Sequence, residues 1–320
     1  MPDRRLRVGL LDVESSHLHG SWMQERLCAR WPSLEVALRS LGARPRRSGG
    51  AGRGNGRAPV PIREFYSEPV YQALLKGEVD VGVHRMKDLP MPLPEGTDLV
   101  AVTERKTPLD VLVTADGAIL DDLPEGARLG VSSVRRQAQL ARYRSDLTLE
   151  FIVGSLSERI HLVDSGKLDG VVVAAAGIEW RGWQHRVSEV FTAHVCLPAI
   201  AQGALGLLCR ADDAATAGKL RFLDDALSHA EIDAERAFFG AVGAWEGAPI
   251  GGLARVRGDI LRIEGCVCAL DGRQILRDWA EGFPDDPLRT GERLAKKLLD
   301  LGAADLLEQS RRQTGRGEQA

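Results

Sequence analysis

Two short stretches of the chain combine side chains that could bind or react with a small polar molecule. In VGVHRMKDLPMPLPEG, a segment typical of a buried strand ends at Lys87 and Asp88, just before a proline-rich turn. Open α/β sheets bind ligands at the carboxyl ends of their strands, so an ammonium and a carboxylate here indicate a binding or catalytic site. A solvated surface turn is the plainer interpretation of the same pair.

The second stretch, LGVSSVRRQAQL, reads as a strand followed by a helix. Ser132 and Ser133 lie at the expected helix start, and Arg135 and Arg136 lie in its first turn. Free amides and the helix dipole make such a start attractive to anions. Arginines oppose that dipole, so a bound carboxylate or phosphate would explain why they are there.

Two more arginines, Arg159 in GSLSERIHLVD and Arg186 in RGWQHRV, could add guanidinium groups to the same lobe. Each guanidinium can hold a carboxylate through two parallel hydrogen bonds, although each residue also fits a solvated helix surface. The seven histidines and five cysteines show no metal-ligand spacing, and no CxxC pair is present. We therefore expect no metal site.

The elements that must position these residues follow an α/β rhythm. Short apolar runs such as VDVGVHR, VLVTA and GVVVAAAG alternate with segments of helical period such as ERIHLVDSG. Apolar runs without alternation favour buried strands, so we predict an α/β protein with largely parallel sheets.

Two short hinges, KTPLD and LPAIAQG, divide this rhythm. If the chain leaves one lobe at the first hinge and returns at the second, the segment between them forms a lobe of its own, and a ligand cleft would lie between the two. We predict three domains, the first of them discontinuous: residues 1–105 with 200–222, residues 106–199, and residues 223–320.

Two loops stand out within this plan. Residues 42–61 are rich in glycine and arginine without apolar periodicity, which predicts a mobile loop, either a linker or a lid over an anionic ligand. In the third domain, Ser228 and Glu231 have the spacing of a capping box at a helix start. After that helix, the turn-rich stretch GAWEGAPIGG at residues 243–252 leads into alternating strands.

The bulk composition restricts the partners. A net charge of −3 over 320 residues provides no global basic field for nucleic acid or an anionic membrane. No apolar run is long enough for a membrane span. We expect a cytoplasmic monomer whose partner is a small molecule.

Several motifs in order resemble one enzyme family. VHRMKDLP, SSVRRQAQL, AAAGI before RGWQHR, LPAIAQGALG, DAERAF and APIGG are similar to hydroxymethylbilane synthase, also called porphobilinogen deaminase, over nearly the whole chain. The resemblance implies three α/β domains, the first two like periplasmic binding proteins about a cleft. It also implies removal of ammonia from porphobilinogen, an azafulvene, and pyrrole addition to a dipyrromethane primer held as a thioether on a cysteine.

The resemblance also implies roles for individual residues. Asp88 matches the catalytic aspartate that lies against pyrrole N–H groups and stabilises the cation formed when ammonia leaves. Six residues match those that hold the primer's carboxylates: Lys87, Ser132, Ser133, Arg135, Arg136 and Arg159.

The chain departs from the family at five positions. Leu11 and Val13 replace an Arg-x-Ser pattern, Val153 replaces an arginine before the ERIHL helix, and Trp180 replaces another arginine. The primer cysteine falls on Glu246, whose carboxylate is a poor anchor because a thioether needs a soft thiolate.

We therefore predict an enzyme that deaminates porphobilinogen or a related carboxylated aminomethylpyrrole through an azafulvene. It would carry no covalent cofactor, bind a dipyrromethane or pyrrole noncovalently, and release a mono- or dipyrrole. One alternative is an ordinary hydroxymethylbilane synthase with an unusual primer. The other is a catalytically silent homologue that binds pyrroles or polycarboxylates.

Overall fold

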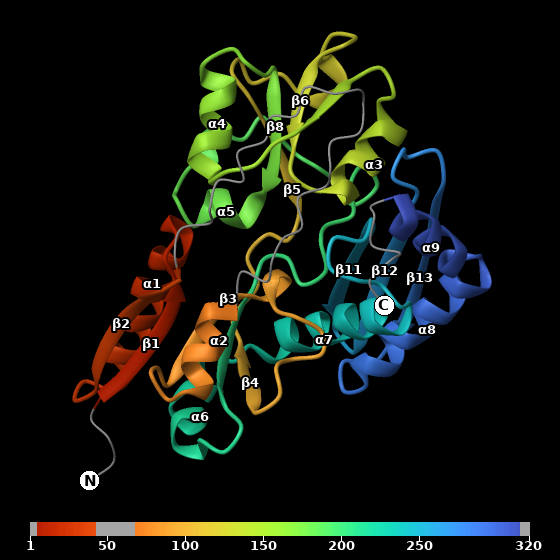
Figure 1. Ribbon diagram of the computed structural model, residues 1–320. Coiled ribbons are helices and arrows are strands. Elements are labelled where there is room, and N and C mark those ends of the chain that lie inside the picture. Colours follow the sequence, from red (N-terminus) through yellow and green to blue (C-terminus); the bar gives the residue numbers. More distant parts are fainter. Residues whose placement is uncertain (1–4, 43–67, 314–320) are drawn as a thin grey trace. The chain divides into compact units, whose positions relative to one another are not determined.

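The structure, a computed structural model, describes residues 5–42 and 68–313 (Figure 1). These residues fall into two compact units. The first unit contains the described residues up to Arg105 together with Ala204–His229. The second contains Lys106–Gly203 and the described chain from Ala230 onward. The predicted α/β class is confirmed, because strands and helices alternate in both units. The predicted loop at 42–61 lies outside the described residues except for Gly42.

The first unit is built on a five-stranded sheet of order β2-β1-β3-β10-β4. Its strand β10, from a much later part of the chain, lies between β3 and β4. The elements are β1 (Arg5–Leu11), α1 (Glu14–Arg30), β2 (Glu35–Leu41), α2 (Glu68–Leu75), β3 (Val81–Arg85), η1 (Met86–Asp88), β4 (Thr97–Val102), β10 (Leu205–Arg210), α6 (Ala214–Leu220) and η4 (Arg221–Leu223).

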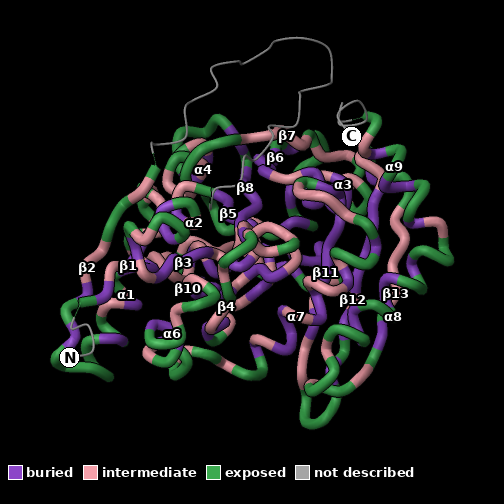
Figure 2. Tube along the Cα trace, turned by 60° about the horizontal axis from the view of Figure 1, so that its bottom comes forward, coloured by how far each residue is buried: buried purple, intermediate pink, exposed green. Residues whose placement is uncertain are grey.

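The second unit contains a five-stranded sheet of order β7-β6-β8-β5-β9. All five residues of β5 are buried, which explains the continuous apolar runs in the sequence (Figure 2). The elements are β5 (Asp110–Thr114), η2 (Leu120–Asp122), β6 (Arg128–Val131), α3 (Val134–Tyr143), β7 (Thr148–Phe151), α4 (Leu156–Asp164), β8 (Gly170–Ala174), α5 (Ala175–Glu179), η3 (Gln184–Arg186) and β9 (Glu189–Val190).

Both five-stranded sheets are mixed rather than largely parallel, which corrects the prediction. In the first, β1 pairs in parallel with β2 and β3, whereas β10 runs antiparallel to β3 and β4. In the second, β6 pairs in parallel with β7 and β8, whereas β5 runs antiparallel to β8 and β9. Strands β5 and β10, which run antiparallel to their neighbours, each follow one of the two hinges. A parallel strand needs a crossover connection, usually a helix, and neither hinge contains one.

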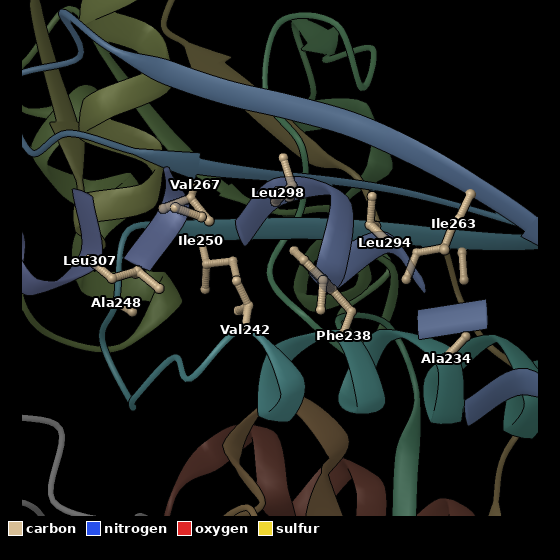
Figure 3. Packing of buried hydrophobic residues seen from close by; sticks show 14 of the residues in the cluster. Ala234, Phe238, Val242, Ala248, Ile250, Ile263, Val267, Leu294, Leu298 and Leu307 are labelled. Atoms are coloured by element: carbon tan, nitrogen blue, oxygen red, sulfur yellow. The ribbon is translucent and has the colours of Figure 1, made fainter. Parts of the chain in front are cut away.

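A third sheet, also in the second unit, has the order β11-β12-β13 and is antiparallel. Phe238 and Leu294, on helices, and Ile263, on a strand, belong to its buried core, and Figure 3 shows Phe238 pointing from its helix toward the strands. The elements here are α7 (Ala226–Ala241), most of which belongs to this unit, β11 (Ile250–Arg257), β12 (Ile260–Cys268), β13 (Ile275–Gly282), α8 (Pro287–Asp300) and α9 (Ala303–Gln313).

The capping box predicted at Ser228 is wrong. Helix α7 begins two residues earlier, at Ala226, and the Ser228 N–H donates to Asp225 Oδ1 at 2.8 Å. The Ser228 hydroxyl instead accepts from the Arg105 N–H, and Glu231 accepts from Arg255. Within residues 5–42 and 68–313, no helix is long and apolar enough to cross a membrane.

Candidate functional site

The first unit brings together the ends of two strands that carry predicted site residues. Strand β1 ends at Leu11, and its parallel neighbour β3 ends at Arg85, directly before Lys87 and Asp88 in η1. Parallel neighbours have their carboxyl ends at the same sheet edge. Leu11 and Asp88 therefore lie at the same edge of the sheet.

Asp88 is held in place by its own neighbourhood. Its side chain is 8% exposed, and its Oδ2 lies 2.5 Å from the Nε of Arg85, which is more open to solvent. His84, four residues earlier on strand β3, is buried, and burial lowers its pKa to about 4, while the charge of Asp88 acts in the opposite direction. A neutral imidazole thus lies near the carboxylate at physiological pH.

The two divergent positions at the end of β1 offer no guanidinium. Leu11 and Val13 are half-buried, and Val13 is the N-cap of α1 without a side-chain cap. Between them, the exposed Asp12 lies 3.3 Å from His17 Nε2. This corner therefore presents apolar and acidic groups.

The second unit gathers most of the remaining candidates at one edge of its five-stranded sheet. Strands β7, β6 and β8 are parallel and end there, and β5, which is antiparallel to β8, begins there. Asp110 at the start of β5 pairs with Ala174 at the end of β8. Ser132 follows the end of β6, and Trp180 follows α5, which begins directly after β8.

Two of the predicted anion-binding arginines are buried against an internal carboxylate. Arg135 and Arg136 are 4% and 3% exposed, and each places an Nη2 at 2.7 Å from one oxygen of Asp110. Gln202 Nε2 also donates to Asp110, at 2.9 Å. These guanidinium groups hold the pKa of the fully buried Asp110 well below its usual range, despite the opposing effect of burial.

The two serines at the start of α3 have different partners. Ser133 is the N-cap of this helix, and its hydroxyl accepts from the Arg136 N–H. The Ser132 hydroxyl accepts from Arg136 Nη1 at 3.1 Å and from Arg159 Nη1 at 2.8 Å. Within the described part of the chain, the buried Arg136 Nε has no hydrogen-bond partner. Ser132 thus joins Arg159 to the Asp110 network.

The structure does not join Arg186 to this group through any contact that it describes. Its Nη2 lies 2.5 Å from Asp164 at the end of α4. Val153 is 68% exposed, and the next turn is formed by Ser155, which caps α4 in a capping box with Glu158. The ligand roles of these residues stay predictions.

Sequence reasoning missed Asp110, the residue at the centre of the network. In the sequence it is only the last residue of the KTPLD hinge. A carboxylate directly before the apolar run VLVT was an available signal, because a charge at the start of a fully buried strand needs a partner.

The stretch between α7 and β11 forms a tight turn. The Ala248 N–H donates to the Trp245 carbonyl, and Gly247 has a positive φ of 84° that suits glycine. Glu246 thus occupies the second position of this turn and is half-buried. The Trp245 ring packs against the core and lies 4.7 Å from the Arg311 guanidinium carbon.

Comparisons with known proteins decide the family. Residues 59–218 match the family described as porphobilinogen deaminase, dipyromethane cofactor binding domain. The porphobilinogen deaminase of Pelotomaculum thermopropionicum is 36% identical over 98% of this chain and 99% of its own length. The chain belongs to the porphobilinogen deaminase family. The porphobilinogen deaminase of Syntrophus aciditrophicus is 41% identical over 78% of this chain and 82% of its own length.

The similarity to solved structures is more remote. The methionine-binding protein MetQ has a TM-score of 0.42 and 13% identity over 69% of this chain and 90% of that one. The family assignment therefore rests on the sequence relatives. As a member of the porphobilinogen deaminase family, the chain is an enzyme of the transferase class.

The turn at residues 245–248, where the resemblance places the anchor of a covalent dipyrromethane, holds no thiol. Glu246 stands at the position that the resemblance gives to the anchoring cysteine, and the five cysteines all lie elsewhere. Burial raises the pKa of the Cys196 thiol to about 12 and that of the Cys209 thiol to about 11. Cys266 and Cys268 are fully buried on β12, and the exposed Cys28 lies on α1. A reactive thiolate is absent from the turn.

Proposed function

We propose that this enzyme deaminates porphobilinogen, or a related carboxylated aminomethylpyrrole, without a covalent primer, and releases a mono- or dipyrrole. One observation carries the proposal: Asp88 is present just after strand β3, while the chain has a glutamate, Glu246, where the resemblance places the anchor. The family supports the pyrrole substrate, since its relatives are named porphobilinogen deaminase.

The chemistry assigned to Asp88 is electrostatic. The bond between the methylene carbon and the ammonium nitrogen breaks, the electron pair leaves with ammonia, and the pyrrole nitrogen supplies electrons to form an azafulvene cation. A carboxylate beside the pyrrole N–H stabilises that positive charge as it develops. The ion pair with Arg85 and the low exposure of Asp88 limit its motion and keep it oriented for this task.

The azafulvene is then consumed by a nucleophile that is free in solution. Water adds to the methylene carbon and loses a proton, which gives a hydroxymethylpyrrole. A second pyrrole adds through its unsubstituted α-carbon and loses the proton there, which gives a dipyrrole. In both cases one ammonia is released for each bond formed, and no covalent bond to the protein is needed.

The decisive experiment is incubation of the purified enzyme with porphobilinogen, with ammonia assay and mass spectrometry of the products. We expect ammonia together with a one- or two-ring product. A linear tetrapyrrole would instead show an ordinary synthase, and binding without ammonia release would show a silent homologue.

Asp88→Asn tests the role of the carboxylate. We expect ammonia release to fall by roughly 10²-fold or more, because the charge that stabilises the cation is lost while the shape is kept. Asp98→Asn, which changes an exposed aspartate on β4 of the same unit, is the control and should retain full activity. Equal rates for Asp88→Asn and the wild type would contradict the assignment.

A further inference from the structure

A lysine and a tryptophan that are distant in sequence stack on one another near the edge of the second unit's five-stranded sheet where Asp110 lies. Lys106 Nζ lies 4.8 Å from the centroid of the Trp180 ring, and both residues are half-buried. An ammonium at this distance is attracted to the negative face of the ring. The indole therefore gives a preferred direction to a side chain that is otherwise flexible.

Backbone hydrogen bonds position both partners. The Lys106 N–H donates to the Gly203 carbonyl at 3.1 Å, and the Trp180 N–H donates to the Ala176 carbonyl at 3.0 Å. The two segments are joined because the Ala175 N–H donates to the Leu109 carbonyl, next to the pairing of β5 with β8. The register of the sheet thus brings the lysine and the tryptophan together.

The charges at this edge favour an anion. Arg135 and Arg136 share the single carboxylate of Asp110, so two positive charges against one negative leave one positive charge. Arg159 is linked to them through Ser132. Lys106 lies four residues before Asp110 and adds its ammonium at the same edge. Partial burial strengthens the attraction of such a group for an anion.

We propose that Lys106, oriented by Trp180, binds one carboxylate of the substrate and so determines which pyrroles the enzyme accepts. The chemical class of the ligand rests on the proposed function. An ammonium is a compact charge that can meet a carboxylate from several directions, whereas a guanidinium favours one planar arrangement. The indole beside it supplies an apolar wall for a flat ring. The pair therefore suits a small aromatic ring with a short carboxylate side chain.

The test is calorimetric titration of porphobilinogen into the Asp88→Asn enzyme, in which the ligand is not consumed. Adding Lys106→Gln should weaken binding roughly tenfold, because a hydrogen bond to a charged group is lost. Lys106→Arg keeps the charge and should therefore bind more tightly than Lys106→Gln, although its planar guanidinium fits the site less freely than the ammonium does. Lys167→Gln, which changes an exposed lysine of the same unit, should bind like the parent.

The charge-retaining variant separates binding from packing. If Lys106→Gln and Lys106→Arg weaken binding equally, the lysine acts only through its packing on Trp180, and the proposal is overturned. It is also overturned if Lys106→Gln binds within about twofold of the parent, or if porphobilinogen does not bind at all. Thermal unfolding of each variant shows whether the fold is intact.

Turnover measurements distinguish failure of this inference from failure of the proposed function. In the enzyme with intact Asp88, Lys106→Gln should raise KM roughly tenfold and change kcat by less than about threefold, since the contact exists in the bound ground state. Binding that depends on Lys106 without ammonia release would reject the proposed function and keep this inference. Ammonia release by Lys106→Gln with an unchanged KM would reject this inference and keep the proposed function.

Discussion

At the scale of single residues, Asp110 determines how the arginines of the second unit can act. Its carboxylate accepts from Arg135, Arg136 and Gln202, so much of the hydrogen-bonding capacity of these groups is used inside the protein. Buried ions are costly unless they are paired and hydrogen-bonded. The network therefore holds positive charge at the sheet edge. The bond from Arg136 Nη2 to Asp110 also orients Nη1 of the same guanidinium, which donates to Ser132.

Replacement of Asp110 by asparagine should destabilise the enzyme strongly. Two buried guanidinium groups would lose their only described acidic partner, and removing one partner of a buried ion pair costs about 3–5 kcal/mol. Urea unfolding of Asp110→Asn measures this loss. The control is Asp164→Asn, which breaks the more exposed pair with Arg186 and should cost less than about 1 kcal/mol.

The same residue predicts a pH dependence of stability. The pKa of Asp110 is lowered in the folded state, so its contribution is fully present above the unfolded value of about 3.9 and is lost as pH falls toward the folded value. The difference in unfolding free energy between wild type and Asp110→Asn should therefore be constant from pH 7 to about pH 5 and shrink below about pH 4. A difference that grows on acidification would contradict this sign.

At the scale of elements, close helix packing supports the third sheet. A Cβ added at Gly291 of α8 would lie within 3 Å of backbone atoms of Ala234 and Phe238 in α7. A glycine here lets the two helices approach closely. The core that they share, which includes Phe238 and Leu294, depends on that approach.

Gly291→Ala should therefore destabilise the second unit by about 1–3 kcal/mol through overpacking. Gly240→Ala is the matched control, because Gly240 lies in α7 with nothing within 4 Å of its added Cβ. This change should stabilise by about 0.5 kcal/mol, since alanine favours the helix more than glycine does. Denaturant unfolding of the two variants should give effects of opposite sign.

At the scale of the whole molecule, the chain keeps the extent of its family while changing particular positions. Its relative from Pelotomaculum thermopropionicum aligns over 98% of it, so no domain-sized segment of that relative is missing. The resemblance places its departures at single residues: Leu11 and Val13 around the end of β1, Val153 after β7, Trp180 after α5 and Glu246 in one turn. We infer that the scaffold serves a modified reaction.

The mass of the intact chain tests the covalent state directly. After exposure to porphobilinogen and denaturation, the wild type should have the mass of the bare polypeptide, because the Glu246 carboxylate has no sulfur for a thioether and could form only an ester that hydrolyses. Glu246→Cys should gain the mass of two pyrrole rings, whereas Glu246→Ser, without a thiolate, should remain bare. A wild-type adduct would place the attachment at another residue and reject the primer-free proposal.

The sequence alone determined the α/β class, the buried strands that precede Asp88 and Ser132, and the family, although the strand before Asp88 ends three residues earlier than predicted, at Arg85. These properties depend on local apolar patterns and on short motifs whose order along the chain can be read directly. The position of the α7 start could not be settled in this way, because Asp225 and Ser228 are both good N-caps and tertiary contacts of Ser228 decided between them.

Only the tertiary structure decided which charges meet. Asp110 lies 25 and 26 residues before the arginines that it binds, and Lys106 lies 74 residues before Trp180. These contacts follow from the strand order β6-β8-β5 and from the antiparallel direction of β5. Apolar periodicity marks a buried strand but does not specify its neighbour or its direction, so the side chains that meet at the sheet edge become known only once the sheet is assembled.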